Sequence, residues 1–477
     1  MPSSAPLAPV QPEPAVPRAI GILDGLTIGL ALVALSTFVT GGFRADILGL
    51  RLSTTSWLRV AVFTVAVTVA RHLWRRAPNL AMRTWRGLGR WRRDPVTRAT
   101  WPIVAVTRVG VLVIGLLAVH AIGYPDGRAP FRVGEGEVAN LPARFDAGWY
   151  LTIASTGYHY QPNRLTRQQN LVFFPAFPTL MYWASLLLAR QLVWSGALIS
   201  IIAFAWAARY LYRLARDMMD EDRAIAAVTL AAAYPFAVFY SAPYTEGLFL
   251  LAMLGAWWHL RRDQRWAAFA WGFLAGLTRP NGCLLSVPLA LVVLAPLWRH
   301  GRLQRPTGGW LSLTDRMAVA AAPGLGMLAY SAFVYDKTGD PFMWIRLQQA
   351  WGRDNIGVAA FLAGEAQSLG EQGLYAYVSV DVTNFLNACA ALLVAASVVP
   401  VWRRFGTPMA MVVLVNLLPS LASGGWLSVG RATAVLFPLF LWLADVVPAR
   451  HRLVWVGAFA AVQAFGASLF FTWRPFF

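Results

Sequence analysis

Cysteine, lysine and acidic residues are scarce in this chain of 477 residues. Only two cysteines occur, Cys283 and Cys389, and both lie in apolar runs. Neither a disulfide framework nor a cysteine-based metal site is therefore expected. Charged residues make up only 13% of the chain and hydrophobic residues 57%, whereas a soluble domain carries about 25% charged residues. We therefore predict a polytopic membrane protein.

The shortage of acidic residues leaves a net charge of +19, which could indicate a nucleic-acid-binding protein. The basic residues, however, lie in short loops between apolar runs, as the positive-inside rule predicts for membrane proteins. We therefore exclude nucleic acid as a partner. Lys337 is the only lysine, so arginine supplies nearly all of the positive charge. This composition is typical of GC-rich bacterial genomes and suggests a multi-pass protein of the plasma membrane.

The apolar runs predict about 13 transmembrane helices. The basic segment from Arg71 to Arg98 is assigned to the cytoplasm, although the same charges would also suit anionic lipids or a partner protein. Residues 1–18 are predicted to be a disordered tail without a signal peptide. The predicted spans are 19–42, 55–73, 101–123, 192–212, 224–240, 247–260, two short helices within 267–298, 317–335, 381–401, 408–422, 432–447 and 453–472.

Two long polar loops are predicted on the extracytoplasmic side, 124–190 and 336–380. The segment 171–188 contains Pro175 and Pro178. Proline disrupts regular helix, so we interpret this segment as a re-entrant or surface helix. The interruption at 278–282 divides the apolar run 267–298 into two short helices that meet on the outer side. Such interrupted helices are typical of a binding cavity.

Asp146 is the best candidate for a catalytic group, and two interpretations of it stay open. It precedes a predicted helix that begins at Ala147, so it could be an N-cap. It could also be a general base. Arg431 and Arg279 are either arginines that reach to the membrane interface or ligands of a lipid phosphate. Glu246 could simply place its charge favourably at a helix N-terminus.

Several motifs that bind soluble substrates are missing. The His, Asp and Glu residues show no metal-site spacing, and the chain contains no glycine-rich phosphate loop. No metal ligands and no cofactor are predicted, although a divalent cation carried by a phosphate stays open. An enzyme of this composition would need a donor that is already in the membrane.

Six short motifs, taken in chain order, resemble the PIG-V-type mannosyltransferases of the glycosyltransferase C (GT-C) superfamily. The resemblance covers roughly residues 100–450, and each motif alone is weak. The motifs are Arg144–Tyr150, Phe173–Pro178, Pro243–Gly247, Thr278–Gly282, Gly339–Pro341 with Gln349–Arg353, and Gly430–Arg431 before Phe437–Pro438.

The resemblance implies an all-α GT-C-like bundle whose first outer core loop carries interfacial helices. Residues 19–100 would add two N-terminal spans and the basic cytoplasmic loop. Residues 101–300 would form the conserved catalytic module, and residues 301–477 the variable C-terminal helices. The superfamily often has two neighbouring acids, but Ala147 and Gly148 follow Asp146 here. A second acid would have to come from elsewhere, for example from Asp126, Glu135 or Glu137.

The resemblance also implies an activity. The protein would be an inverting mannosyltransferase that moves mannose from a polyprenyl-phosphate carrier to a lipid or glycolipid acceptor on the extracytoplasmic side. Asp146 would be the catalytic base, and Arg431 and Arg279 would bind the donor phosphate. Further substrate-binding residues are predicted from the motifs: Arg144, Trp149, Tyr150, Phe174, Pro175, Tyr244, Glu246, Asn281, Gln349, Trp351 and Arg353. The alternative is a lipid-linked sugar flippase or transporter, which the lack of an internal repeat disfavours.

Overall fold

The protein is described here from a computed structural model. The structure describes residues 18–40, 43–47, 50–54, 56–74, 80–127, 131–295, 298–299, 302–303 and 309–476. The expected disordered tail, apart from its last residue, lies outside the described residues. The chain divides into two compact units. The first contains Met1–Arg92 and Ser185–Arg190, and the second contains Arg93–Ala184 and Gln191–Phe477.

The first unit is built on two packed helices, α1 and α2, which lie where the first two spans were predicted. Neither is among the helices that are long and apolar enough to cross a membrane. Arg71 of α2 donates to Asp24 of α1 over 2.8 Å, and both residues are buried. Pairing the charges offsets the cost of removing them from water. The antiparallel hairpin β1–β2 and the helix α3 were not predicted. The elements of this part are α1 (Arg18–Thr40), β1 (Phe43–Ile47), β2 (Leu50–Thr54), α2 (Trp57–Trp74) and α3 (Leu80–Arg93).

From residue 95 onward, the regular elements of the described chain are helices, apart from one hairpin of two two-residue strands. Its elements are α4 (Pro95–Ala121), α5 (Glu137–Asn140), α6 (Ala147–Thr156), η1 (Pro162–Arg164), η2 (Asn170–Val172), α7 (Ala176–Leu187), α8 (Leu192–Arg216), α9 (Glu221–Ala233), η3 (Pro235–Ser241), α10 (Glu246–Arg261), α11 (Arg265–Thr278), η4 (Pro280–Leu285), α12 (Ser286–Leu294), β3 (Trp298–Arg299), β4 (Arg302–Leu303), α13 (Gly309–Thr338), α14 (Met343–Arg346), η6 (Leu347–Trp351), α15 (Val358–Val380), α16 (Val382–Phe405), α17 (Thr407–Ala422), α18 (Val429–Ala434), α19 (Phe437–Val446) and α20 (Ala449–Phe471).

Five helices among the described residues are long and apolar enough to cross a membrane, or six if the bent pair α9–η3 is one span. The chain is therefore an integral membrane protein. The five are α4, α8, α13 from Ser312, α16 and α20. Shorter apolar helices fill most of the other predicted spans. At 12 residues, α7 is about 18 Å long, which agrees with the prediction that 171–188 does not cross fully.

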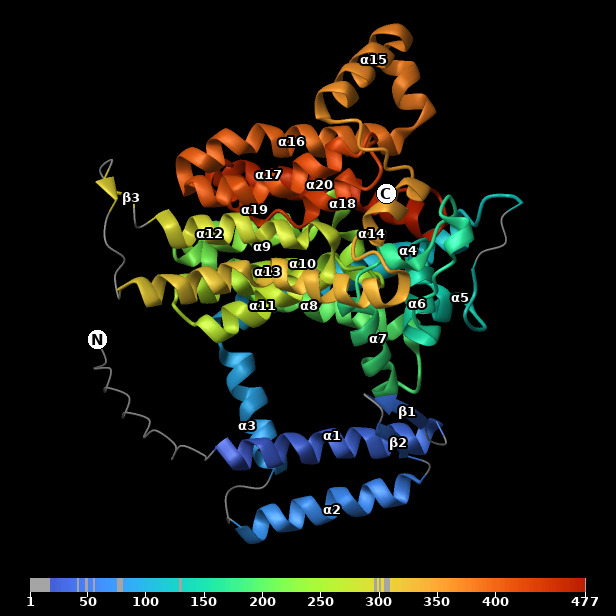
Figure 1. The fold of residues 1–477 in the computed structure, drawn as a ribbon, viewed down its shortest axis with the longest axis vertical. Helices are drawn as coiled ribbons and strands as arrows, with labels where there is room; N and C mark the ends of the chain where they lie inside the picture. Colours follow the sequence, from blue (N-terminus) through green and yellow to red (C-terminus); the bar gives the residue numbers. More distant parts are fainter. Residues whose placement is uncertain are drawn as a thin grey trace, which may run out of the picture. The chain divides into compact units, whose positions relative to one another are not determined.

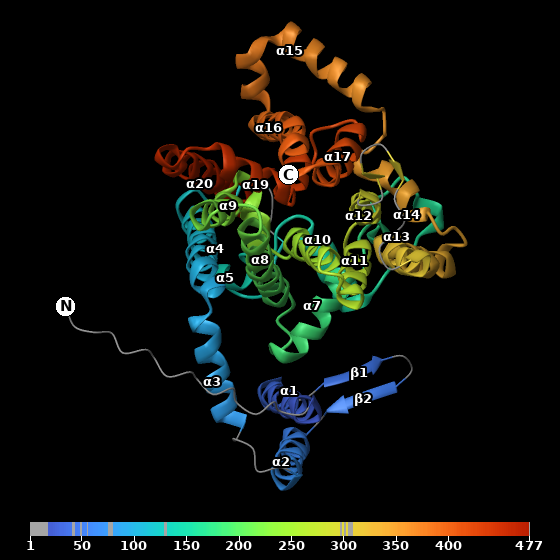
Figure 2. The same cartoon turned by 90° about the vertical axis from the view of Figure 1, so that its left-hand side faces the viewer.

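Close contacts join helices of the second unit that are labelled in Figure 1. α10 packs between α8 and α11, and α11 packs against α13, in the order seen in Figure 2. Small residues allow these contacts, as is common between membrane helices. A Cβ at Gly247 would lie 2.6 Å from the carbonyl oxygen of Ser200, and one at Gly276 would lie 1.9 Å from that of Pro323. The second predicted outer loop is largely helical. Its main element, α15, is kinked at Gly373 and forms an arch in Figure 2.

The segment before the functional site is a broken helix. α9 ends before Tyr234, and η3 leaves at an angle of 78°. The break frees backbone carbonyl groups, which must find donors in an apolar environment. Arg108 of α4 donates to the carbonyls of Ala232 (2.6 Å) and Ala237, and Gln463 of α20 donates to those of Ala232 (3.1 Å) and Tyr234 (2.8 Å). Arg108 is fully buried and was not among the predicted residues.

The interruption at 278–282 was predicted and is confirmed. α11 ends at Thr278, Arg279 is extended (φ −148°, ψ 153°), and η4 begins at Pro280. The extended residue lets the Arg279 side chain leave the helix end toward the neighbouring α10, where the site lies.

Candidate active site

The turn before α6 holds Asp146 in a fixed position. Phe145 has φ +47°, a left-handed conformation that a bulky residue adopts only under constraint. The Tyr244 hydroxyl spans this turn, since it donates to the carbonyl of Arg144 (3.1 Å) and accepts from the backbone N–H of Asp146 (3.2 Å). Asp146 occupies the N-cap position, but among the described residues its carboxylate caps no backbone N–H. The N-cap interpretation is therefore wrong for this side chain.

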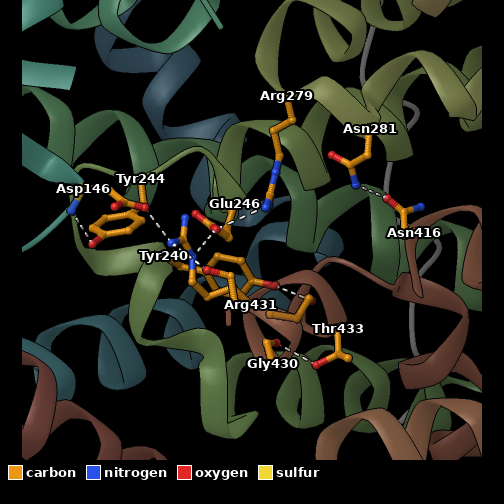
Figure 3. A network of polar contacts seen from close by, with 12 residues as sticks. Asp146, Tyr240, Tyr244, Glu246, Arg279, Asn281, Asn416, Gly430, Arg431 and Thr433 are labelled. Atoms are coloured by element: carbon orange, nitrogen blue, oxygen red, sulfur yellow. Dashed lines mark hydrogen bonds and ion pairs between the residues drawn. The ribbon is translucent and has the colours of Figure 1, made fainter. Parts of the chain in front are cut away.

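A network of ion pairs joins four distant parts of the chain, as Figure 3 shows. Arg431 Nη1 donates to Asp146 Oδ2 over 2.7 Å, and Arg431 Nε donates to Glu246 Oε1 over 2.9 Å. Arg279 Nη1 reaches the same Glu246 oxygen at 3.3 Å. The Glu246 side chain is fully buried, that of Arg431 is 6% exposed, and that of Asp146 is 23% exposed. Asp146 is thus the member of the network that solvent or a substrate reaches most easily.

The rings of Phe239 and Tyr244 lie beside Arg431, with centroids 4.9 Å and 4.7 Å from its guanidinium carbon. Aromatic faces attract cations, and this attraction is stronger when water is excluded. The rings and the two carboxylates therefore confine the guanidinium to one position. Phe239 was not among the predicted site residues.

The short helix α18 carries Arg431, and its packing on η3 fixes its position. A Cβ at Gly430 would lie 2.2 Å from the ring of Phe236, so only glycine fits at this contact. The Gly430 N–H donates to Asn387 Oδ1 of α16 (2.5 Å), and the Tyr240 hydroxyl donates to the carbonyl of Ala434 (2.6 Å). Each end of α18 is therefore bonded to a different element of the bundle.

An aromatic cluster lies next to Asp146, at the start of α6. Trp149 stacks on Phe173 at 6.0 Å between centroids, and Trp351 packs against both rings at 5.2 Å. Tyr150, one residue further on α6, lies 6.5 Å from the ring of Tyr244. Burial raises the pKa of Tyr150, and the nearby carboxylates of Glu246 and Asp146 raise it further. The phenol of Tyr150 therefore stays protonated at neutral pH.

The structure brings Asp146, Tyr244, Glu246, Arg279 and Arg431 together. Trp149, Tyr150 and Trp351 lie beside them. Arg353 lies close enough to interact electrostatically with Asp146, Arg279 and Arg431. The side chains of the other predicted substrate-binding residues make no hydrogen bond or ion pair with this network among the described residues, although the Arg144 carbonyl accepts from Tyr244. Arg144 is fully buried and donates to the carbonyls of Phe471 and Asn140, both at 2.7 Å. This geometry fits a structural role.

Four further predicted residues occupy varied environments. Phe174 is buried against Trp344, and Pro175 is half-buried before α7. Asn281 donates to Asn416 of α17 over 2.8 Å, and Gln349 is exposed in η6. No contact with the Asp146 network is shown for these four among the described residues.

The second carboxylate of the site comes from α10, not from the loop that holds Asp146. Glu137, one of the candidates in that loop, instead accepts from Arg132 (2.6 Å) and from the Tyr124 hydroxyl. Glu246 was predicted to contact substrate. In the structure its Oε1 accepts from both arginines, and its buried Oε2 has no hydrogen-bond partner among the described residues. Within the described parts of the chain, no group of three or more His, Cys, Asp or Glu side chains could hold a metal ion.

Fold and site together define a helical integral membrane protein with a network of carboxylates and guanidinium groups at its helix ends. Residues 132–298 match the family model described as "Mannosyltransferase (PIG-V)". This part of the chain is therefore a PIG-V mannosyltransferase family domain, as the resemblance implied. The domain contains Asp146, Glu246 and Arg279, whereas Arg431 lies beyond it.

The chain is also similar to two solved structures of an oligosaccharyltransferase from Archaeoglobus fulgidus. One is tethered to an acceptor peptide that contains the NVT sequon (TM-score 0.36), and the other, AglB, is in complex with an inhibitory peptide and a dolichol-phosphate (TM-score 0.39). Identity is 13% in both, and the matches cover 80% of this chain but only 56% of the other. No curated protein matches the chain.

Proposed function

We propose that this protein is a membrane mannosyltransferase that moves mannose from a polyprenyl-phosphate carrier to a lipid or glycolipid acceptor. The contact that carries the proposal is the 2.7 Å ion pair between Asp146 and Arg431, at a site made from the PIG-V family domain and a later helix. It places an acid that can accept a proton within a cluster of guanidinium groups, whose positive charge favours the departure of a phosphate.

In the proposed reaction, an acceptor hydroxyl attacks the anomeric carbon of mannose while Asp146 takes the hydroxyl proton. The new carbon–oxygen bond forms as the bond to the carrier phosphate breaks. The phosphate leaves with the bonding electron pair, and the configuration at the anomeric carbon is inverted. Because a phosphate departs without protonation, a second catalytic acid is unnecessary, in contrast to glycoside hydrolysis.

The geometry of Asp146 suits this role. Arg431 binds Oδ2, and no described residue donates a hydrogen bond to Oδ1. One oxygen therefore orients the carboxylate while the other is free to accept a proton. The cationic side of the network, to which Arg279 and Arg431 contribute, would stabilise the charge that develops on the departing phosphate.

The proposed bundle has about 13 spans. The charges at its helix ends support an extracytoplasmic location of the site. α10 begins in the site at Glu246 and carries His259 and Arg261 in its last turn. α16 bonds to Gly430 through Asn387, near its start, and carries Arg403 and Arg404 in its last turn. Both basic ends therefore lie a helix length away from the site. Since basic ends favour the cytoplasm, the site is assigned to the opposite face of the plasma membrane.

The experiment is a transfer assay with purified protein in proteoliposomes. Polyprenyl-phosphate mannose labelled in the sugar is supplied as the donor, with a membrane lipid extract as the source of acceptors. We expect a labelled glycolipid to appear and free polyprenyl phosphate to accumulate. Movement of the labelled donor between leaflets without any new product would contradict the proposal and favour the flippase alternative.

A further inference from the structure

The two arginines first assigned to the donor phosphate are already paired with acids. Arg431 is bonded to Asp146 and Glu246, and Arg279 is bonded to Glu246. For either to bind a phosphate fully, it would have to weaken a contact with a carboxylate. If Glu246 lost both partners, a fully buried charge would be left unpaired, which is costly.

Arg353 is a third guanidinium at the same site, and it has no such partner. Across the part of the chain that the structure describes, its side chain makes no hydrogen bond or ion pair. It is half-buried. Burial, followed by the positive charges of Arg431 and Arg279, lowers the pKa of Arg353, while Asp146 and Tyr150 oppose this shift. Arginine nevertheless remains charged at neutral pH.

The packing of η6 explains how Arg353 reaches the site. Trp351, at the end of η6, packs against Trp149, three residues after Asp146. Gly352 follows in a left-handed conformation (φ +71°) and turns the chain sharply before Arg353. The contact of Trp351 with Trp149 and the turn at Gly352 therefore hold Arg353 near the start of α6. The indole N–H of Trp351 is itself buried and finds no acceptor among the described residues.

The site therefore contains three arginines and two acids, and one positive charge is left without a counterion. A partly buried cation without a partner is unfavourable, and an anion that enters the site would relieve this cost. Guanidinium groups bind phosphate oxygens through two parallel hydrogen bonds. A phosphodiester carries one negative charge, which equals the uncompensated charge of the site.

We infer that Arg353 is the residue that binds the phosphate group of the donor. Arg431 is then a positioning residue, which together with Glu246 holds the Asp146 carboxylate in place. That the phosphate belongs to a sugar carrier rests on the proposed function. The presence of an anion site at Arg353 does not depend on it.

The test measures binding as well as turnover. Full-length protein in nanodiscs is titrated with a polyprenyl phosphate and with the uncharged polyprenol of the same length. The wild type should bind polyprenyl phosphate more tightly than polyprenol. Arg353→Ala should reduce this preference, the ratio of the two affinities, about 10- to 100-fold, in line with the loss of a charge-assisted hydrogen bond. Polyprenol binding should not change. Phosphatidylglycerol and inorganic phosphate are used as competitors to separate a carrier phosphate from other phosphates.

Arg346→Ala is the matched control. Arg346 lies seven residues earlier in the same loop, but its side chain is 73% exposed and is paired with Asp340. This variant should keep the wild-type preference for the phosphate. The thermal unfolding midpoint of Arg353→Ala should be equal to or higher than that of the wild type, since an unpaired charge has been removed. A lower midpoint with an unchanged preference would show that Arg353 has only a structural role.

In transfer assays, Arg353→Ala should raise KM for the donor more than it lowers kcat. If the wild type transfers mannose but its preference for the phosphate does not depend on Arg353, the inference is wrong and the proposed function stands. If no transfer occurs but the preference depends on Arg353, the anion site is supported and the proposed function is wrong. Competition by inorganic phosphate as strong as that by polyprenyl phosphate would overturn the assignment to a lipid carrier.

Discussion

Arg431 Nη1 lies 2.7 Å from Asp146 Oδ2, although the two residues are 285 positions apart in the chain. The same guanidinium bonds to Glu246 through Nε. Asp146 is therefore oriented by a residue that is itself oriented by a second, fully buried acid.

Replacement of Asp146 by asparagine should abolish transfer but leave the fold intact. The amide keeps the shape of the side chain but cannot take a proton, so kcat should fall about 100- to 10,000-fold. Initial rates in proteoliposomes would measure this loss, and size-exclusion chromatography in detergent would verify folding. Asp126→Asn is the control, because Asp126 is exposed in the same loop. Normal turnover in Asp146→Asn would rule out its role as the base.

Replacement of Glu246 by glutamine should destabilise the protein. The change leaves Arg431 and Arg279 without their shared buried acid, and breaking a buried pair costs about 3–5 kcal/mol. The thermal unfolding midpoint in detergent should fall by several degrees, and transfer should fall with it. Glu135→Gln, at an exposed position, should behave as the wild type. Full stability in Glu246→Gln would mean that the network does not hold this part of the fold together.

Replacement of Gly430 by alanine should displace Arg431 without removing any functional group. The added Cβ would lie 2.2 Å from the ring of Phe236, and overpacking of this kind costs about 1–3 kcal/mol. Transfer should therefore fall sharply, and a smaller side chain in the double variant Gly430→Ala/Phe236→Leu should restore part of it. Gly457→Ala in α20 is the control, because a Cβ there meets nothing within 4 Å. A fully active Gly430→Ala would contradict the packing described for α18.

Replacement of Tyr244 by phenylalanine should loosen the turn before α6. The ring is kept, but the hydroxyl that joins Arg144 to Asp146 is lost, and leaving a buried N–H unpaired costs about 1–3 kcal/mol. We expect lower kcat with a nearly unchanged donor KM, since Asp146 and not the phosphate site is affected. Tyr335→Phe, at an exposed position on α13, should change neither. An equal rise in donor KM would place Tyr244 in substrate binding instead.

Hydropathy and proline position were sufficient to predict much of the fold. Apolar runs located the five described helices that are long and apolar enough to cross a membrane, although about 13 spans were predicted. Pro280 with Gly282 located the break after Thr278. The hairpin β1–β2 was missed because it is a short local structure between two apolar runs, where hydropathy carries no information about strands. α15 was missed because a polar, glycine-containing segment was interpreted as a loop.

The candidate site could be predicted in part. Asp146, Arg431 and Arg279 were chosen as charged residues on one face of the membrane, and the structure brings them together. Pairing depends on tertiary contacts, so the sequence could not show that Glu246 binds both arginines or that Arg353 lacks an acid. Arg108 did carry a signal that was overlooked, since it is an arginine in the middle of an apolar run, where a charge needs internal partners.

The break between α9 and η3 has a consequence for how the protein is made. Two donors that satisfy its free carbonyls, Arg108 and Gln463, lie 355 residues apart and belong to α4 and α20. While the ribosome is still translating α20, the carbonyl of Tyr234 lacks the Gln463 donor and Arg144 lacks the carbonyl of Phe471. A chain that stalls or is cut before α20 would carry unsatisfied polar groups in the lipid, and membrane proteases that survey nascent proteins could recognise it by them.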